Sequence, residues 1–148
     1  MSQGHSHTLE KVFKSDTRQL ENVRSFVESA ARDFGFADEE VSNIILAVDE
    51  ACTNIIKHAY GGRKNGDIRI EVLRSATSFS VRIQDHGKAF NPEGIEPPNL
   101  QKHLAEYRRG GLGVYLMRRM MDKVEYAIAP GKPNEVTLVK YRSESART

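Results

Sequence analysis

The chain has 148 residues, which is the length of a single domain and excludes a large multi-domain active site. Hydrophobic residues make up 39% and charged residues 28% of the chain, as in an ordinary compact globular domain. The 22 lysine and arginine residues nearly balance the 20 aspartate and glutamate residues, so the net charge of +2 argues against a protein that binds nucleic acid by neutralising phosphates.

The first third of the chain is predicted to hold a short strand followed by a helix. Residues 1–7 are expected to form a flexible tail, and residues 9–13 a strand. Apolar residues then recur at helical spacing, starting after a cap at Asp16 or Thr17 and stopping at Gly35. This pattern is typical of an amphipathic helix that packs one face against a core.

A second helix is predicted from Asp38 to the pair Gly61-Gly62. The Asp38 side chain is placed to cap its N-terminus, and glycine is typical of a helix end. Cys52 lies on the apolar stripe of this helix, so we interpret its thiol as core packing. As the one cysteine of the chain, it can form neither an internal disulfide nor a cysteine-based zinc site, which fits a reducing cytoplasm.

The rest of the chain is predicted to form two hairpins separated by a long loop and a helix. The loop contains three prolines and several glycines without a sustained period, and we predict that it is a lid. In chain order, the elements are strands 68–72 and 79–83, the loop 86–111, a helix over 112–122, and strands 124–128 and 136–139.

These elements predict an α/β (α+β) fold in the form of a two-layer sandwich. Strands joined by hairpins imply a mostly antiparallel sheet, and helices that are apolar on one side imply that they cover one face of it. Residues 8–142 are expected to form one domain, and residues 143–148 a C-terminal tail. No apolar run approaches the roughly 18 residues of a membrane span, and the first ten residues do not resemble a signal peptide, so we expect a cytoplasmic protein.

Polar residues interrupt the pattern of the second helix. Glu50, Asn54 and His58 follow each other at intervals of four residues, beside the small side chains of Ala47 and Ala51. The Asn54 amide can offer an oxygen to Mg²⁺, and Glu50, one turn earlier, can polarise a group that attacks a phosphate. A solvated helix face would show the same spacing.

A carboxylate stands where an apolar residue is expected in the second predicted strand. Alternation places Phe79, Val81 and Ile83 toward the core, and the same parity places Asp85 there. A buried charge needs a donor, and Gly87 would let a ligand approach the backbone closely. The carboxylate would accept a hydrogen bond from the amino group of adenine but would face the carbonyl group of guanine. A turn-capping aspartate is the alternative.

Glycines lead directly into the third predicted helix. The run Arg109-Gly110-Gly111-Leu112-Gly113-Val114 exposes backbone N–H groups beside the positive end of that helix, which suits phosphate. Arg108 and Arg109 could hold a γ-phosphate there. The spacing matches neither a Walker A motif nor a complete dinucleotide fingerprint, and a flexible turn is the alternative.

Taken in order, the stretches Glu50-Ala51-Cys52-Thr53-Asn54, Asp85-His86-Gly87-Lys88-Ala89-Phe90 and Gly110-Gly111-Leu112-Gly113-Val114 resemble the N, G1 and G2 boxes of the GHKL ATPase superfamily. Within it, the chain most resembles the bacterial anti-sigma factor serine/threonine protein kinases, over nearly all of residues 8–142. The resemblance implies a Bergerat-type, histidine-kinase-like fold that binds ATP and Mg²⁺ under a mobile lid.

The resemblance also implies roles for individual residues. Glu50 would be the catalytic general base, Asn54 the Mg²⁺ ligand and Asp85 the adenine acceptor. With Arg109 and Asn134 added, the expected ATP-binding residues are Asn54, Asp85, Gly87, Ala89, Phe90, Arg109, Gly110, Gly111, Leu112, Gly113, Val114 and Asn134.

Two positions depart from the superfamily pattern. Ala89 replaces a second glycine of the G1 box, which the anti-sigma branch often tolerates. Before the last strand, Pro133 and Asn134 replace a Gly-Thr pair whose threonine supports the adenine aspartate through its hydroxyl group. Asn134 can also donate a hydrogen bond to that aspartate.

The function implied by the resemblance is that of an ATP-dependent serine/threonine protein kinase acting as an anti-sigma factor. It would phosphorylate a STAS-type antagonist protein and bind a sigma factor elsewhere on a homodimer. The main alternative is a non-catalytic ATP-binding switch that sequesters a partner protein. A plain ATPase without a protein acceptor, and a structural domain without nucleotide affinity, also remain open.

Overall fold

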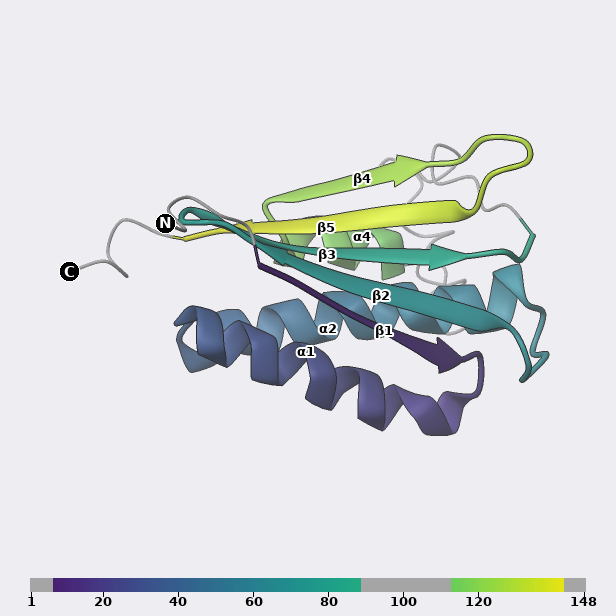
Figure 1. Cartoon of the computed structure of the whole chain (residues 1–148), viewed down its shortest axis with the longest axis horizontal. Coiled ribbons are helices and arrows are strands. Elements are labelled where there is room, and N and C mark those ends of the chain that lie inside the picture. The colour runs from purple at the N-terminus through teal and green to yellow at the C-terminus, as the bar shows by residue number, and fades with distance from the viewer. Residues whose placement is uncertain (1–6, 89–112, 143–148) are drawn as a thin grey trace.

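The computed structural model describes residues 7–88 and 113–142, and it arranges them in two layers (Figure 1). One layer is a five-stranded sheet of order β1-β2-β3-β5-β4, in which every neighbouring pair is antiparallel. Helices lie on one face of this sheet, so the predicted two-layer sandwich is confirmed. The elements are β1 (His7–Lys14), η1 (Thr17–Gln19), α1 (Leu20–Phe34), α2 (Asp38–Asn54), η2 (Ile55–Ala59), β2 (Asp67–Arg74), β3 (Ser78–Asp85), α4 (Gly113–Met120), β4 (Lys123–Ala127) and β5 (Asn134–Tyr141).

The central strand β3 alternates strictly between the core and the open face of the sheet. Its buried positions run from Phe79, which is wholly inaccessible to solvent, to Asp85 at the end of the strand. The side chains between them face outward, where Arg82 bonds to Glu71 at 3.0 Å and Gln84 bonds to Glu135 at 2.8 Å. The period of two in the sequence therefore determines which side chains enter the core.

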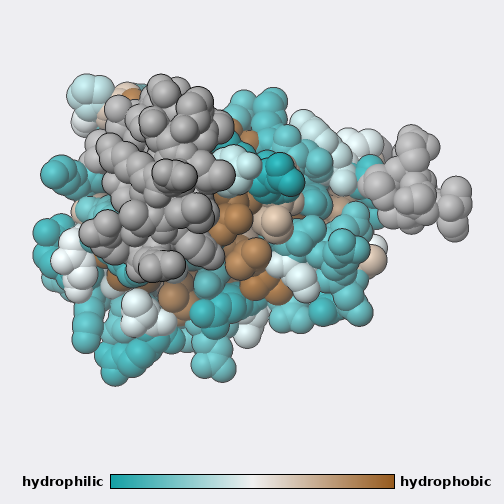
Figure 2. Space-filling model, turned by 180° about the vertical axis from the view of Figure 1, so that it is seen from behind, coloured by the Kyte–Doolittle hydropathy of each residue, from teal (hydrophilic) through white to brown (hydrophobic). Residues whose placement is uncertain are grey.

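The helical layer packs around α2, which contacts both α1 and α4. Buried residues of all three helices form one core with the inner face of the sheet. Cys52 is wholly buried, so the prediction that it packs in the core is confirmed, and burial raises the pKa of its thiol to about 12. Seen from behind, hydrophobic side chains gather near the middle of the molecule (Figure 2). None of the helices in the described residues has the length and hydropathy to cross a membrane.

The end of α1 follows the expected local signal, whereas the expected cap lies one short turn before the helix, whose own N-cap residue, Gln19, makes no side-chain cap hydrogen bond. Asp16 caps the preceding turn η1, where its side chain accepts a hydrogen bond from the Arg18 backbone N–H at 2.9 Å. Gly35 ends α1 with a φ of 104°, and its N–H bonds to the carbonyls of Ala31 and Arg32. A left-handed residue at this place favours glycine because it has no Cβ.

The cap predicted for α2 is wrong by one residue. Asp38 is the first helical residue, and the residue in the N-cap position is Ala37. The Asp38 carboxylate instead pairs with Arg32 at 2.6 Å, and the Ala37 N–H bonds to the Glu40 side chain at 3.0 Å. The Asp38 carboxylate is oriented toward the guanidinium of Arg32. Arg32 belongs to the preceding helix, so the sequence pattern at the start of α2 does not indicate this contact.

We expect Ala37→Ser to stabilise the protein by about 0.5–1 kcal/mol, because a serine hydroxyl would accept a hydrogen bond from the N-terminal turn of α2 that alanine cannot accept. Glu40 already supplies the reciprocal half of this arrangement. Urea unfolding of the variant and the wild type measures the difference. Glu40→Ala is the matched control and should shift the unfolding midpoint in the opposite direction. An Ala37→Ser midpoint at or below that of the wild type would contradict the assignment of the cap.

Candidate functional site

The Asp85 carboxylate lies inside the molecule at the end of β3. Its residue is 4% exposed, which agrees with the inward orientation expected from strand parity. Its Oδ1 atom accepts hydrogen bonds from the Gly87 backbone N–H at 2.8 Å and from Asn134 Nδ2 at 2.9 Å. A buried carboxylate without donors would be costly, so these two bonds are what allows a charge at this position.

Asn134 reaches Asp85 because the two residues stand opposite each other in the pairing of β3 with β5. Its Nδ2 atom donates a second hydrogen bond, to the Gly87 carbonyl at 3.0 Å. Both neighbours are acceptors, so only the NH₂ side of the amide can face them, and both of its hydrogens are used. Asn134 therefore donates a hydrogen bond to Asp85, as expected for a residue that replaces the threonine of the superfamily pattern.

Gly87 has a packing role that the sequence did not indicate. A Cβ atom at this position would collide with the carbonyl of Ala59 in η2, whereas the expected close approach of a ligand to the Gly87 backbone stays a prediction. The Lys88 N–H bonds to the same Ala59 carbonyl at 2.7 Å. The missing side chain thus lets the segment after β3 pack against the end of the second helix.

One cavity brings Asp85 together with Asn54 of α2, which is 9% exposed. Its walls are mostly apolar, with a few polar groups, a combination typical of sites for small organic ligands. The cavity is lined by Ala51, Asn54, Ile55, Ala59, Ile83, Asp85, Lys88, Tyr126, Ile128, Asn134, Glu135 and Val136.

Glu50 is half-buried and does not line this cavity. It lies on α2 one turn before Asn54, as predicted. Burial raises the pKa of its carboxyl group, the neighbouring charge of Asp49 raises it further, and Lys57 opposes them. A carboxylate with a raised pKa holds a proton more readily, which suits a general base.

The alignment of side chains expected from the interval of four residues between Glu50, Asn54 and His58 does not continue to His58. The α-helical hydrogen-bond pattern ends at Asn54, and residues 55–59 form the π-helical turn η2. A π turn contains more residues than an α turn, so the interval of four residues no longer keeps side chains in line. His58 is accordingly exposed, whereas Asn54 is buried.

Two of the predicted phosphate-binding residues lie at the start of α4. Gly113 begins the helix, and Val114, 1% exposed, packs its side chain into the core. Only the backbone of Val114 can therefore face a ligand. The predicted residues Ala89, Phe90, Arg109, Gly110, Gly111 and Leu112 lie outside the described residues, as does the predicted lid after Lys88, so their roles stay predictions.

The described residues offer one oxygen ligand, which would suit a Mg²⁺ ion whose other ligands are phosphate oxygens and water. Residues 7–88 and 113–142 contain no group of three or more histidine, cysteine, aspartate or glutamate side chains that could hold a metal. The buried Asn54 amide offers one oxygen beside the cavity. Mg²⁺ commonly takes one or two protein oxygens and completes its shell with phosphate oxygens and water.

Sequence reasoning missed the part of the cavity wall that comes from β4 and the residue after it. Tyr126 and Ile128 form part of it, and burial raises the pKa of Tyr126 to about 12. Tyr126 alternates with Val124 on the partly buried side of β4, so this part of the signal was present in the sequence. The strand order, which places β4 beside β5 at this end of the sheet, was needed to connect it with Asp85.

Comparison with known proteins gives a consistent set of relatives. Residues 13–140 match the family described as the histidine kinase-like ATPase domain. The chain is 34% identical to the serine-protein kinase RsbW of Listeria monocytogenes serovar 1/2a over 114 residues, which cover 74% of this chain and 71% of that protein. It is 31% identical to the protein of the same name from Bacillus pumilus over 109 residues, covering 70% and 67% of the two chains. The corresponding protein of Bacillus subtilis is 31% identical over 106 residues, covering 69% and 66%.

We expect Asn134→Asp to destabilise the protein by about 2 kcal/mol at pH 8, because a second carboxylate would replace the donor beside Asp85. A proton shared by the two carboxyl groups would restore one donor. The folded variant would then bind that proton more tightly than the unfolded chain, so its stability should be lost as the pH rises and largely recovered at pH 5. Urea unfolding of both proteins at the two pH values tests this, and an equal loss at both would contradict it.

Proposed function

The chain belongs to the histidine kinase-like ATPase family, and from this premise we propose that it is an ATP-dependent serine-protein kinase. The observation that carries the proposal is the shared cavity of Asp85 and Asn54, two polar groups from different elements that are suited to opposite ends of ATP. Support for transfer to a protein comes from the name serine-protein kinase, which the relatives in Listeria and Bacillus bear.

Adenine would bind with its amino group against Asp85. Both donors from the described residues reach Oδ1 of this carboxylate, so Oδ2 is the oxygen proposed to accept the amine. The apolar walls would cover the faces of the base, for example through Ile55 and Ile83. Guanine would bring a carbonyl oxygen to the same place, where two acceptors would meet without a hydrogen.

The phosphates would lie between α2 and the N-terminus of α4. Asn54 would hold Mg²⁺ through its amide oxygen, and the ion would neutralise charge on the phosphates during transfer. Backbone N–H groups of Gly113 and Val114 would bind phosphate oxygens at the positive end of α4. The remaining proposed contacts, from Ala89, Phe90, Arg109, Gly110, Gly111 and Leu112, follow from the resemblance of the sequence.

In the proposed transfer, Glu50 accepts the proton of the attacking serine hydroxyl group. The serine oxygen forms a bond to the γ-phosphorus of ATP, the bond from that phosphorus to the bridging oxygen breaks, and ADP leaves with the bonding electrons. The half-buried carboxylate has a raised pKa, which brings its proton affinity closer to that required of a base near neutral pH. Fixed donors around the phosphates supply the rest of the rate enhancement.

We further propose that the protein is a cytoplasmic anti-sigma factor. Its substrate would be a STAS-type antagonist protein, and a sigma factor would bind elsewhere on a homodimer, as the family resemblance implies. Residues 8–142 would form the kinase domain, with 86–111 as an ATP lid, and neither a membrane nor a nucleic acid would be a direct partner.

A non-catalytic ATP-binding switch is the second candidate function. It is favoured by the position of Glu50, which does not line the cavity that holds Asp85 and Asn54. In this case ATP would only shape the surface that captures a partner. Substitution of Glu50 separates the two functions, because the switch does not need a base.

We expect the wild type to prefer Mg·ATP to Mg·GTP, and Asp85→Asn to weaken ATP binding by about 10–100-fold, which corresponds to the loss of one charge-assisted hydrogen bond. Gly87 and Asn134 would keep the new amide oxygen in place of Oδ1, so the NH₂ group would face the amine of adenine. The difference in affinity between Mg·ATP and Mg·GTP should therefore be smaller in the variant. Isothermal titration calorimetry measures all four affinities, and equal affinity of the wild type for the two nucleotides would refute the adenine site.

We expect Glu50→Gln to lower phosphate transfer to a STAS-type substrate at least about 100-fold while the Kd for Mg·ATP changes less than about twofold. Because the pKa of Glu50 is raised, transfer by the wild type should decline as the pH falls, starting at a higher pH than for an ordinary glutamate. Transfer of radiolabelled phosphate across a pH series tests both statements. Transfer that survives in the variant would exclude Glu50 as the base, and a wild type that binds ATP without transfer to any candidate substrate would favour the switch.

A further inference from the structure

We infer that Tyr60 is a positioning residue of the nucleotide site, which acts through the backbone that follows Asp85 and holds it against the helix that carries Asn54. The inference rests on the proposed binding of ATP between these two residues. Tyr60 itself does not line the cavity.

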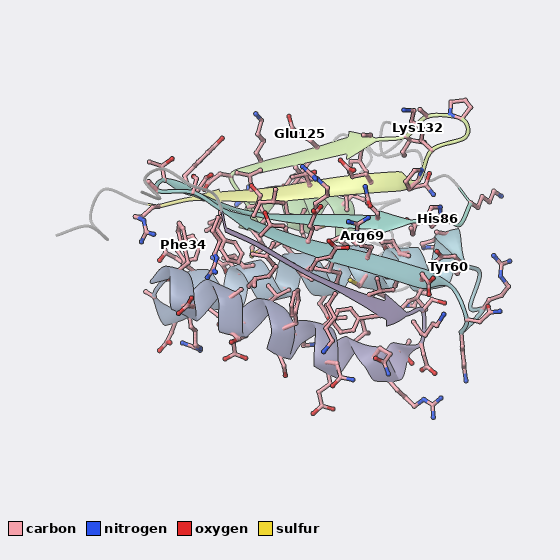
Figure 3. All side chains as sticks on the ribbon, viewed as in Figure 1. Phe34, Tyr60, Arg69, His86, Glu125 and Lys132 are labelled. Carbon is pink, nitrogen blue, oxygen red and sulfur yellow. The ribbon has the colours of Figure 1, made fainter. Side chains whose placement is uncertain are left out.

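The hydroxyl group of Tyr60 joins the start of β2 to the residue that follows β3. It donates a hydrogen bond to the Asp67 carbonyl at the start of β2, at 2.7 Å, and accepts one from the His86 N–H, at 2.9 Å. Figure 3 shows Tyr60 and His86 at the same end of the sheet, opposite the end that holds Phe34. His86 directly follows Asp85, so the tyrosine fixes the first peptide group after the proposed adenine acceptor.

The position of the Tyr60 ring is narrowly defined. The residue is 5% exposed, and a Cβ atom at Gly66 would collide with the ring. Burial raises the pKa of its hydroxyl group, so the group stays protonated and can donate its hydrogen bond to the Asp67 carbonyl. Close packing around the ring and two hydrogen bonds to the hydroxyl oxygen restrict the Tyr60 side chain to one conformation.

The π-helical turn η2, which directly precedes Tyr60, holds Gly87 and Lys88, the two residues after His86. The Tyr60 N–H bonds to the Ile55 carbonyl at 2.9 Å, which closes the π-helical turn η2. At the end of that turn, the Ala59 carbonyl accepts the Lys88 N–H and occupies the space beside Gly87. A helix end has carbonyl groups without helical partners, and here residues of the G1 segment satisfy one of them.

These contacts connect the two proposed ends of the nucleotide site. Asn54 directly precedes η2, and Asp85 directly precedes the segment that η2 and Tyr60 hold. The spacing between the amide oxygen and the carboxylate therefore depends on this junction. A ligand that spans both groups binds well only when they are correctly spaced, because each misplaced contact is lost without any compensating gain.

The test is Tyr60→Phe, which keeps the ring and removes the hydroxyl group. We expect the Kd for Mg·ATP to rise about tenfold, because the His86 and Asp67 backbone groups lose their partner and the peptide after Asp85 is no longer fixed. The amide of His86 should also exchange with solvent faster in NMR spectra. Gly66→Ala is a second variant, since it displaces the ring without removing the hydroxyl group, and it should weaken ATP binding in the same direction.

The control separates positioning from stability. Val72→Ala removes buried side-chain atoms from β2 at a position paired with Val81, away from the register pair of Ile68 with Asp85. All titrations are made at a temperature where unfolding curves show each variant fully folded, so lost stability cannot itself weaken binding. Val72→Ala should then retain the wild-type Kd.

Three results would overturn the inference. If Tyr60→Phe binds Mg·ATP with the wild-type Kd, the hydroxyl group has only a structural role, and the proposed function stands. If the wild type does not bind Mg·ATP, both the inference and the proposed function fail. A Val72→Ala variant that loses affinity as strongly as Tyr60→Phe would also contradict positioning by the tyrosine.

Discussion

The site depends on a carboxylate that the fold takes out of water at the end of its central strand. Asp85 is 4% exposed, close to the wholly buried aliphatic residues Val81 and Ile83 that precede it on the inner face of β3. A charge in that position is tolerated only where donors surround it, so Gly87 and Asn134 are held in place by the same requirement. The apolar cavity next to it makes each hydrogen bond to a ligand stronger than the same bond would be in water.

The two donors also determine what kind of ligand the carboxylate can recognise. Asn134 uses both amide hydrogens within the protein, one on Asp85 and one on the Gly87 carbonyl. The Gly87 N–H is committed to the same carboxylate oxygen. The carboxylate therefore presents an acceptor to the cavity, and a ligand group that binds to it must bring a donor. An exocyclic amine meets this condition, which is the physical basis of the proposed discrimination between the two purine nucleotides.

Helix α2 and strand β3 contribute to the same site although they belong to different layers. Asn54 ends the α-helical part of the second helix, and the π-helical turn after it presents the Ala59 carbonyl to Lys88. Such turns are frequent where a helix must be redirected at a functional position. The Lys88 N–H thus satisfies a carbonyl at the helix end. This bond fixes the helical layer, which holds the proposed metal ligand Asn54, to the sheet, which holds the proposed adenine acceptor Asp85.

The sequence by itself indicated most elements of the described residues, the inward orientation of Asp85 and the helical stop at Gly35, because strand parity and left-handed backbone are local properties. It did not indicate the π-helical turn after Asn54. It placed the cap of α2 at Asp38 wrongly, since it could not reveal that Arg32 attracts that carboxylate. Only the tertiary structure decided that Asn134 stands opposite Asp85 and that the Ala59 carbonyl fills the space beside Gly87. Both depend on which distant segments become neighbours, and no spacing within one helix or strand contains that information.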